Sequence, residues 1–434
     1  SIEAGGNFNT VVGDEAGTAI TTGDQNVAVG YVALDANTTG GNNTAVGKSA
    51  LSANTTAEGN AAVGHRALEA NTTGAYNSAL GDSALRTNTT ASSNSAVGQS
   101  ALQNNTTGTT NTAVGRNALQ LNTTANNNTA IGYNTLLVNT TGANNVALGG
   151  SALGSNTTAS NNTAIGISAM VANTTGAQNT ALGRLALDAN TTANENTAIG
   201  NSALGANTEG ASNTAVGSGA LSANTTAAHN VAVGDSALLA NTTGTNNTAL
   251  GKGAAESNVD GDQNVIIGAA ANVAATGGDG ANVLGYSVSG AAGYTTLGNT
   301  NDDIRAAHGN TTWATVSDER VKKDITDSTA GLSFINDLRP RTFKYKNKGD
   351  LPKDFNGYEE GSTEAYKNSN TNHGFIAQEV KAVIDSHSEI TDGFRMWDVK
   401  ESGQQEVGEA AVIPILVNAI KELSAKNDAL EARL

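Results

Sequence analysis

The sequence contains no cysteine, only 3 prolines and few aromatic residues, which make up 4% of its 434 residues. The absence of cysteine excludes disulfide bonds and thiolate metal sites, and it leaves the redox compartment open. Charged residues account for only 14% of the chain, which argues against ordinary disorder, because disordered chains usually combine low hydrophobicity with high charge. With so few large side chains, most of the chain cannot form a conventional globular core.

The charge and the hydrophobic pattern exclude two classes of partner. The formal net charge is −16, which disfavours binding to nucleic acid or to an anionic membrane surface. No apolar run approaches the ~20 residues of a membrane span, so we expect no membrane insertion. Nothing in the sequence calls for a cofactor or a metal ion, and we expect neither. The chain starts at Ser1 rather than Met, so we expect a further segment upstream.

An internal repeat dominates the first two thirds of the chain. A glycine that follows an aliphatic residue recurs every 17 residues from Gly13 to Gly285, without insertion or deletion. The consensus is N-T-A-(V/I/L)-G-x-x-A-L-x-x-N-T-T-(G/A)-x-x. Such strict register predicts a β-solenoid, because coils stacked ~4.8 Å apart cannot absorb an extra residue. The spacing of apolar residues and the abundance of Asn, Thr and Gly argue against helices.

We expect two short strands in each coil, one typified by Asn43–Val46 and one centred on Ala50 and Leu51. Val46 and Leu51 are expected to point into the coil, and the recurring glycine is expected to make a tight bend. Asn54 and its equivalents can stack their side-chain amides into a ladder at the other bend.

A single coil has little apolar surface to bury, so we expect the chain to self-associate. Ordering the backbone costs ~1–2 kcal/mol per residue, which two aliphatic residues and two alanines offset poorly. The alanines typified by Ala45 and Ala62 are expected to lie on the strand face opposite the aliphatic residues. We expect this row of small residues to form the seam between chains.

The repeats resemble the head repeats of trimeric autotransporter adhesins, through stretches such as Asn128–Gly132 and Asn230–Gly234. The resemblance implies a trimeric β-roll. Ice binding is an alternative for a solenoid with rows of threonine, here Thr44, Thr112 and Thr129. That row is interrupted by Ala61, Val146 and Val231.

A glycan-cleaving tailspike is another alternative for the shaft, and it requires a pair of carboxylates in a cleft. Glu58, Asp82 and Glu195 occupy different positions of the repeat and do not form such a pair. We therefore expect a shaft without enzymatic activity.

The composition divides the chain into three parts: a repeat shaft over residues 1–285, a neck over 286–316, and a domain of ordinary composition over 317–434. The fold class is therefore expected to be mainly β, with a small α+β domain at the C-terminus. A helix over about 411–434 is expected to close a trimeric coiled coil. Its two heptad seams are Ile413, Ile420, Asn427 and Leu434, and Leu416, Leu423 and Leu430.

Four ordered motifs stand out in the C-terminal domain: S-D-E-R-V-K-K-D-I over 317–325, L-R-P with F-K-Y over 338–345, H-G-F-I-A-Q-E-V over 373–380, and I-P-I-L over 413–416. Together they resemble the endosialidase-type intramolecular chaperones found at the C-termini of phage tail fibres and tailspikes. The resemblance implies a domain that trimerises, templates the preceding β-structure and then cuts the chain between Ser317 and Asp318.

The resemblance also implies the roles of individual residues. Ser317 is the expected nucleophile, Lys322 the general base, and His373 a group that orients or stabilises the tetrahedral intermediate. Asp318 and Glu379 are further candidate helpers. The alternative is that Ser317 only caps a helix, Lys322 is a solvated cation and His373 is a hydrogen-bonded structural histidine.

These features predict a homotrimeric phage tail fibre that is made in the host cytoplasm, joins an upstream virion or anchoring component, and binds a host glycan or protein receptor. A bacterial cell-surface trimeric adhesin with the same chaperone is the alternative.

Overall fold

The computed structural model describes residues 7–300, 302–310, 317, 319, 322–355, 357–390, 394–400 and 403–433. Two compact units make up the chain, Ser1–Val316 and Ser317–Leu434. The first unit is the repeat shaft with its neck, and the second contains the helices.

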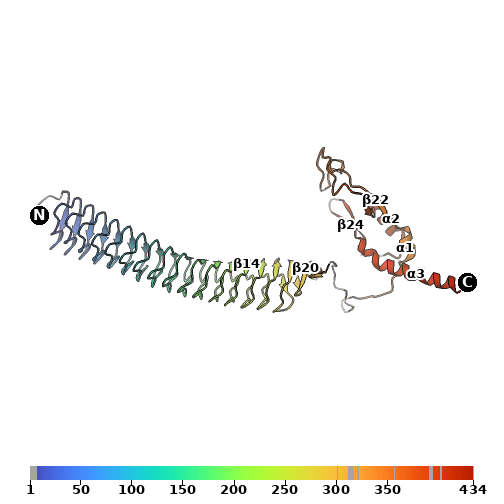
Figure 1. Ribbon diagram of the computed structural model, residues 1–434, viewed down its shortest axis with the longest axis horizontal. Helices are drawn as coiled ribbons and strands as arrows, with labels where there is room; N and C mark the ends of the chain where they lie inside the picture. Colours follow the sequence, from blue (N-terminus) through green and yellow to red (C-terminus); the bar gives the residue numbers. More distant parts are fainter. Residues whose placement is uncertain are drawn as a thin grey trace. The chain divides into compact units, whose positions relative to one another are not determined.

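The shaft is a stack of short strands, one per repeat (Figure 1). Their bounds are β1 Thr10–Val12, β2 Val27–Val29, β3 Thr44–Val46, β4 Ala61–Val63, β5 Ser78–Leu80, β6 Ser95–Val97, β7 Thr112–Val114, β8 Thr129–Ile131, β9 Val146–Leu148, β10 Thr163–Ile165, β11 Thr180–Leu182, β12 Thr197–Ile199, β13 Thr214–Val216, β14 Val231–Val233, β15 Thr248–Leu250 and β16 Val265–Ile267.

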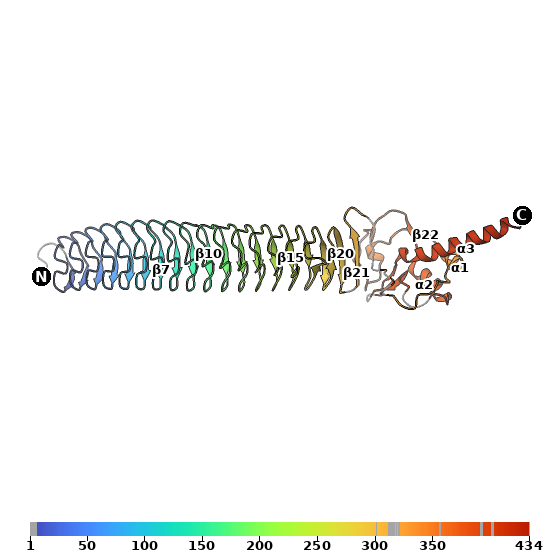
Figure 2. The same ribbon diagram turned by 90° about the horizontal axis from the view of Figure 1, so that it is seen from below.

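Each strand pairs in parallel with the equivalent strand of the next coil, so the repeats stack in register along the shaft (Figure 2). Ala28 pairs with Ala45, and Ala45 pairs with Ala62. The Gly47 amide donates to the carbonyl of Val29 in the preceding coil. The equivalent amide of Gly30, 17 residues earlier, donates to the carbonyl of Val12 in the same way. The structure confirms the predicted β-solenoid.

Among the described residues, a turn takes the place of the expected second strand in the coils from Gly13 to Gly251, and short strands occupy this position only after Gly268 and Gly285, at Asn272–Val273 and Ser289–Gly290. Ser49 and Leu51 have φ angles of 58° and 51°, in the left-handed region that a β-strand cannot contain. The turn still stacks from coil to coil, since the Leu51 amide donates to the carbonyl of Ala67 over 3.0 Å. The prediction of a strand at Ala50 and Leu51 was therefore wrong, because hydrogen bonds between coils also stabilise turns that repeat in register.

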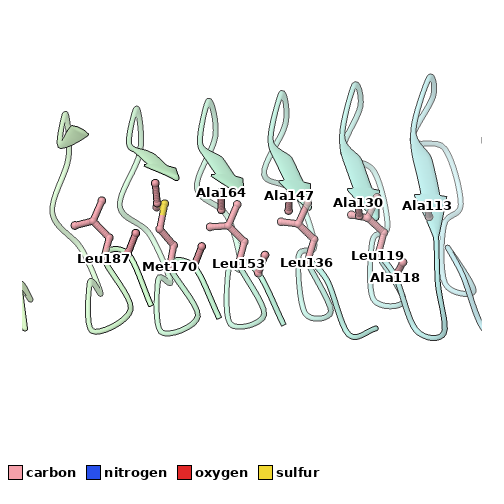
Figure 3. Packing of buried hydrophobic residues seen from close by; sticks show 14 of the residues in the cluster. Ala113, Ala118, Leu119, Ala130, Leu136, Ala147, Leu153, Ala164, Met170 and Leu187 are labelled. Atoms are coloured by element: carbon pink, nitrogen blue, oxygen red, sulfur yellow. The ribbon is translucent and has the colours of Figure 1, made fainter. Parts of the chain in front are cut away.

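The core of the coil holds leucine and alanine, which point toward each other from the turn and the strand (Figure 3). Leu51 is completely buried, as predicted, and so is Ala45. Val46 faces outward instead, and its equivalent Leu80 is 51% exposed. Both the inward placement of Val46 and the alanine seam between chains were wrong, because a coil that holds a buried leucine such as Leu51 leaves room for only a small residue on the inner strand face; the larger Ile266 is buried there where Ala255 replaces the leucine.

Two asparagine ladders fill the rest of the interior. Asn54 is completely buried, and its Nδ2 donates to Asn37 Oδ1 over 2.9 Å and to the Ala57 carbonyl over 3.1 Å. This ladder confirms the role predicted for Asn54. A second ladder runs through Asn43, whose Oδ1 accepts a bond from the backbone amide of Asn60 over 3.0 Å. Because these buried amides bond both within and between coils, the polar groups stabilise the stack.

The residue after each Asn-Thr-Thr unit alternates between glycine and alanine, as at Ala57, Gly74 and Ala91. A Cβ atom added to Gly74 would lie 2.2 Å from the carbonyl oxygen of Ala91 and 2.6 Å from Asn71 Oδ1. A Cβ atom added to Gly244 would lie similarly close, 2.4 Å, to the carbonyl oxygen of Gly261. The glycine positions therefore allow a close approach of backbone between coils, whether the next coil carries alanine or glycine.

The shaft ends where the coil shortens. β18 (Asn282–Tyr286) continues the stack and pairs in parallel with β20 (Tyr294–Asn299), which pairs antiparallel with β21 (Asp302–Ala307). β17 (Asn272–Val273) and β19 (Ser289–Gly290) form a small parallel pair beside them. An antiparallel strand ends the parallel ladder at this point.

The second unit contains short strands and three α-helices among its described residues. Its elements are α1 Leu332–Asp337, β22 Arg341–Phe343, η2 Lys348–Asp350, β23 Asn372–Gly374, α2 Ala377–Ser386, β24 Trp397–Val399, β25 Gln405–Val407, η3 Glu409–Val412 and α3 Ile413–Glu431. Phe334 of α1, Val380 of α2, Met396 and Ile415 of α3 form its core. The larger side chains of this core, such as Phe334, agree with the change from the repeat shaft to an α+β domain that the composition predicted.

Candidate functional site

Ser317 and Lys322 are in contact at the start of the second unit. Lys322 Nζ donates a hydrogen bond to Ser317 Oγ over 2.7 Å. The Lys322 amide also donates to the carbonyl of Glu319 over 3.0 Å, so a tight turn brings the two side chains together. Both side chains are exposed in the single chain. A serine hydroxyl next to a lysine amine is an arrangement capable of base-assisted nucleophilic attack once the amine is neutral.

The other predicted site residues are not joined to this pair. His373 lies on β23, where its backbone pairs with Thr342 of β22, and its side chain is exposed. Among the described residues, no hydrogen bond links His373 to Ser317 or Lys322. Asp318, on the other side of the predicted scissile bond, lies outside the described residues.

Glu379 has a structural partner. Arg341 Nε donates to Glu379 Oε2 over 2.9 Å, and Arg339 approaches the same carboxylate at 3.9 Å. The hydrogen bond from Arg341 lowers the pKa of Glu379. The pair ties α2 to β22, which makes Glu379 a link between the L-R-P-R segment and the Q-E-V helix.

His387 forms a polar cluster that the sequence did not reveal. It follows α2, its side chain is largely buried, and it contacts Glu389 through Nδ1 at 2.7 Å and Asp337 through Nε2 at 2.8 Å. The ring also packs edge-on against Phe334 at a centroid distance of 5.3 Å. These two carboxylates, Glu389 foremost, raise the pKa of His387. Only the H-S-E spacing was visible in the sequence, since Asp337 is 50 residues away.

The residues from 317 to 388 match a family model described as chaperone of endosialidase. The second unit carries a chaperone-of-endosialidase domain. The match includes Ser317, Lys322, His373 and His387, and it ends before α3. No curated protein and no solved structure matched the chain. The likeness of the repeats to adhesin heads therefore stays a prediction, whereas the fit of the chain to a fibre with a C-terminal chaperone domain is confirmed.

A broad groove of about 1710 Å³ runs over the chaperone domain. It is lined by His373, by aromatic residues such as Tyr345 and Trp397, and by several lysines. Lys381 lies over the Trp397 ring at 5.1 Å, and Lys367 over the Tyr345 ring at 5.3 Å. Ser317 and Lys322 do not line this groove. The groove therefore contains His373 but neither residue of the contact between serine and lysine.

Helix α3 of the chaperone domain has one packed face and one open face. Ile415 and Ala419 are buried, and Asn418 Nδ2 donates to the carbonyl of Ala330 over 3.2 Å. The predicted heptad seams face away from this contact, and Ile420 is 65% exposed. The exposed seam residues are Ile413, Leu416, Ile420, Leu423, Asn427 and Leu430. Leu434, the last predicted seam residue, lies outside the described residues.

Two further features of the described part of the chain bear on function. None of its helices has the combination of length and apolar character needed to cross a lipid bilayer. Within the same residues, no three His, Asp or Glu side chains converge in a way that could hold a metal ion.

Proposed function

We propose that the chain is the precursor of a homotrimeric fibre, whose chaperone domain brings three chains together, guides folding of the solenoid and then cuts the chain after Ser317. The chaperone-of-endosialidase match and the solenoid support a fibre or tailspike type of protein. The hydrogen bond between Lys322 Nζ and Ser317 Oγ carries the proposal of self-cleavage. Cleavage at this position releases the compact second unit except for its first residue, Ser317, which stays on the shaft.

The proposed chemistry requires the hydrogen bond between Lys322 and Ser317 to reverse its direction. As described, the lysine ammonium donates to the serine oxygen. After loss of a proton, the neutral amine accepts from the hydroxyl and can take its proton as oxygen attacks a carbonyl carbon. A neutral lysine is favoured by desolvation. Since both side chains are exposed in one chain, the proposal requires neighbouring chains to cover them.

The target of the attack has two alternatives. A serine that attacks the carbonyl of its own residue must close a strained four-membered ring. Attack on the carbonyl of the same bond in a neighbouring chain avoids this ring, and so does a water molecule activated by the pair. Attack by serine breaks the bond to Asp318, whose nitrogen leaves with the proton taken up by Lys322, and forms an ester that a water molecule must then hydrolyse; attack by water gives the carboxylate directly. In both cases the final products are a shaft that ends at Ser317 and a chaperone domain that begins at Asp318.

The open face of α3 supports trimerisation by the chaperone domain. Its apolar residues repeat with heptad spacing, and Asn427 occupies one seam position. In coiled coils, a polar residue at such a position sets register and oligomeric state at some cost in stability. Pairing the seams of three helices buries side chains that a single chain leaves exposed.

Removal of the chaperone makes physical sense for a fibre. Three repetitive chains can pair in many registers, so assembly needs a template. Once the template is gone, the fibre cannot easily reverse its assembly, and its persistence is governed by the rate of unfolding.

The proposed setting is a phage tail fibre assembled in the host cytoplasm, with a host glycan or protein as receptor. A bacterial cell-surface adhesin is the alternative setting. Sequence encoded upstream of Ser1 distinguishes them: virion-assembly sequence indicates a phage fibre, and a secretion signal indicates an adhesin.

Intact mass spectrometry of purified protein tests the cleavage. The wild-type chain is expected to give two fragments that meet at the bond between Ser317 and Asp318. Ser317→Ala and Lys322→Ala are expected to stay whole yet remain trimeric by light scattering. Lys323→Ala, which removes the neighbouring exposed lysine, is expected to be cut like the wild type. Full processing of Ser317→Ala overturns the assignment of the nucleophile.

A further inference from the structure

One face of the shaft carries a continuous apolar stripe. The third residue of each strand from β1 to β16, and Leu284 of β18, is Val, Leu or Ile, and none of these side chains is buried. Leu182, for example, is 44% exposed. This set is called the aliphatic row below. The first residue of each strand points to the same side, because side chains alternate along a strand.

The length of the aliphatic row distinguishes it from ordinary surface residues. Coils spaced ~4.8 Å apart make it roughly 80 Å long. A row of this length exposes on the order of 1,000 Å² of apolar surface, whereas the largest patch on a typical monomer is about 300–600 Å². Such a surface marks an interface.

One edge of the aliphatic row is largely polar. It is formed by the residue after each recurring glycine, and several of these residues contact each other between coils. His65 Nδ1 lies 3.1 Å from Asp82 Oδ2, and the Arg116 guanidinium lies over the Tyr133 ring at 5.7 Å. An apolar centre with a polar rim is the usual composition of a protein interface.

We propose that the aliphatic row is the seam along which the shafts of identical chains pack. The proposal rests on the homotrimer proposed above and assigns its shaft interface. We assign another copy of this chain as the partner because the aliphatic residues of the row recur once per coil. One aliphatic residue projects from every coil, and only a surface with the same coil spacing can match it along its whole length.

Charge favours the same partner. No Lys, Arg, Asp or Glu occupies the first or third position of any strand from β1 to β16. The chain as a whole carries a formal net charge of −16, so identical chains repel one another. This face lets them approach without placing like charges in contact, and it buries aliphatic side chains that contribute about 25 cal/mol per Å² removed from water.

The absence of native cysteine allows a direct test with single cysteine variants of the full chain. Leu182→Cys places a thiol in the aliphatic row, and Thr192→Cys places a control thiol on an exposed turn of the same repeat. Leu148→Cys and Thr158→Cys repeat the comparison two coils away. Each variant is treated with a maleimide probe, before and after unfolding in guanidinium, and its oligomeric state is measured by light scattering.

The expected result is a trimer in which thiols of the aliphatic row react more slowly than control thiols by roughly tenfold or more, because alkylation requires access to the thiolate. After unfolding, the rates are expected to be equal. A trimer whose row and control thiols react alike overturns the seam but leaves the trimer intact, and the face is then open to a different partner. A monomer overturns both the seam and the proposed homotrimer.

Discussion

Lys322 Nζ lies 2.7 Å from Ser317 Oγ at the first residue of the chaperone domain. This contact already exists in a single chain, although both side chains are exposed. What one chain lacks is the desolvation that favours a neutral amine. Trimerisation is the step that can supply it, and cleavage should therefore depend on assembly.

Breaking the α3 seam is expected to prevent cleavage while Ser317 and Lys322 remain in place. Ile420→Asp with Leu423→Asp places charges on side chains that are 65% and 57% exposed in one chain. The domain core should tolerate them, whereas three clustered carboxylates per seam layer oppose coiled-coil pairing. We expect monomers by light scattering and at least a tenfold lower rate of cleavage, which corresponds to about 1.4 kcal/mol.

The matched control for this experiment is Lys421→Asp, which places a carboxylate on the same helix outside the seam. It is expected to trimerise and to be cut at the wild-type rate. Cleavage of the double variant at the wild-type rate while it is monomeric contradicts the dependence on assembly.

Asn105→Ala is expected to loosen the shaft locally. Asn105 Nδ2 donates to Asn88 Oδ1 and to the Gly108 carbonyl, each over 2.9 Å, and its Oδ1 accepts from Asn122 over 2.8 Å. The variant leaves these buried groups short of partners, at about 1–3 kcal/mol for each unpaired group. Hydrogen exchange should accelerate in the coils next to residue 105. Asn104→Ala, at a partly exposed position of the same coil, should change exchange little.

Protonation of His387 is expected to stabilise the chaperone domain. Glu389 and Asp337 raise its pKa in the folded state above the ordinary value of 6.5. The stabilisation is therefore fully present below pH ~6.5 and is lost as pH rises through the higher folded value. The melting temperature of this domain should therefore fall as pH rises above about 6.5. In His387→Gln this dependence should flatten, whereas the exposed His373→Gln should keep it. An unchanged pH profile in His387→Gln contradicts the assignment.

The sequence predicted the solenoid because the spacing of Gly30 and Gly47 has only one structural solution, a stack of equal coils. It did not determine which side of the strand faces inward. Alternation allows Ala45 or Val46 on the inner side, and the choice depends on what faces the strand across the coil. Leu51, in a left-handed turn, and Asn43 are both buried there, and no hydrophobic pattern reveals the positions of these two residues.

The contacts of the candidate site were likewise only partly predictable from the sequence. Ser317 and Lys322 are five residues apart, so a local motif could predict their contact. His387 and Asp337 are separated by 50 residues, and only the packing of α1 against the end of α2 brings them together. The position of His373 in the groove also depends on tertiary structure, since β23 pairs with β22.

Gly74→Ala tests the close approach of backbone between coils at the glycine positions. The added Cβ would lie 2.2 Å from the Ala91 carbonyl oxygen, so the two coils must separate or the ladder at Asn71 must shift. Overpacking of this kind costs about 1–3 kcal/mol. Gly150→Ala is the matched control, because a Cβ there meets nothing within 4 Å. Thermal unfolding of the shaft should begin at a lower temperature in Gly74→Ala, with protease cleavage near residue 74, and remain unchanged in Gly150→Ala. Equal stability of the two variants would show that neighbouring coils accommodate alanine in succession.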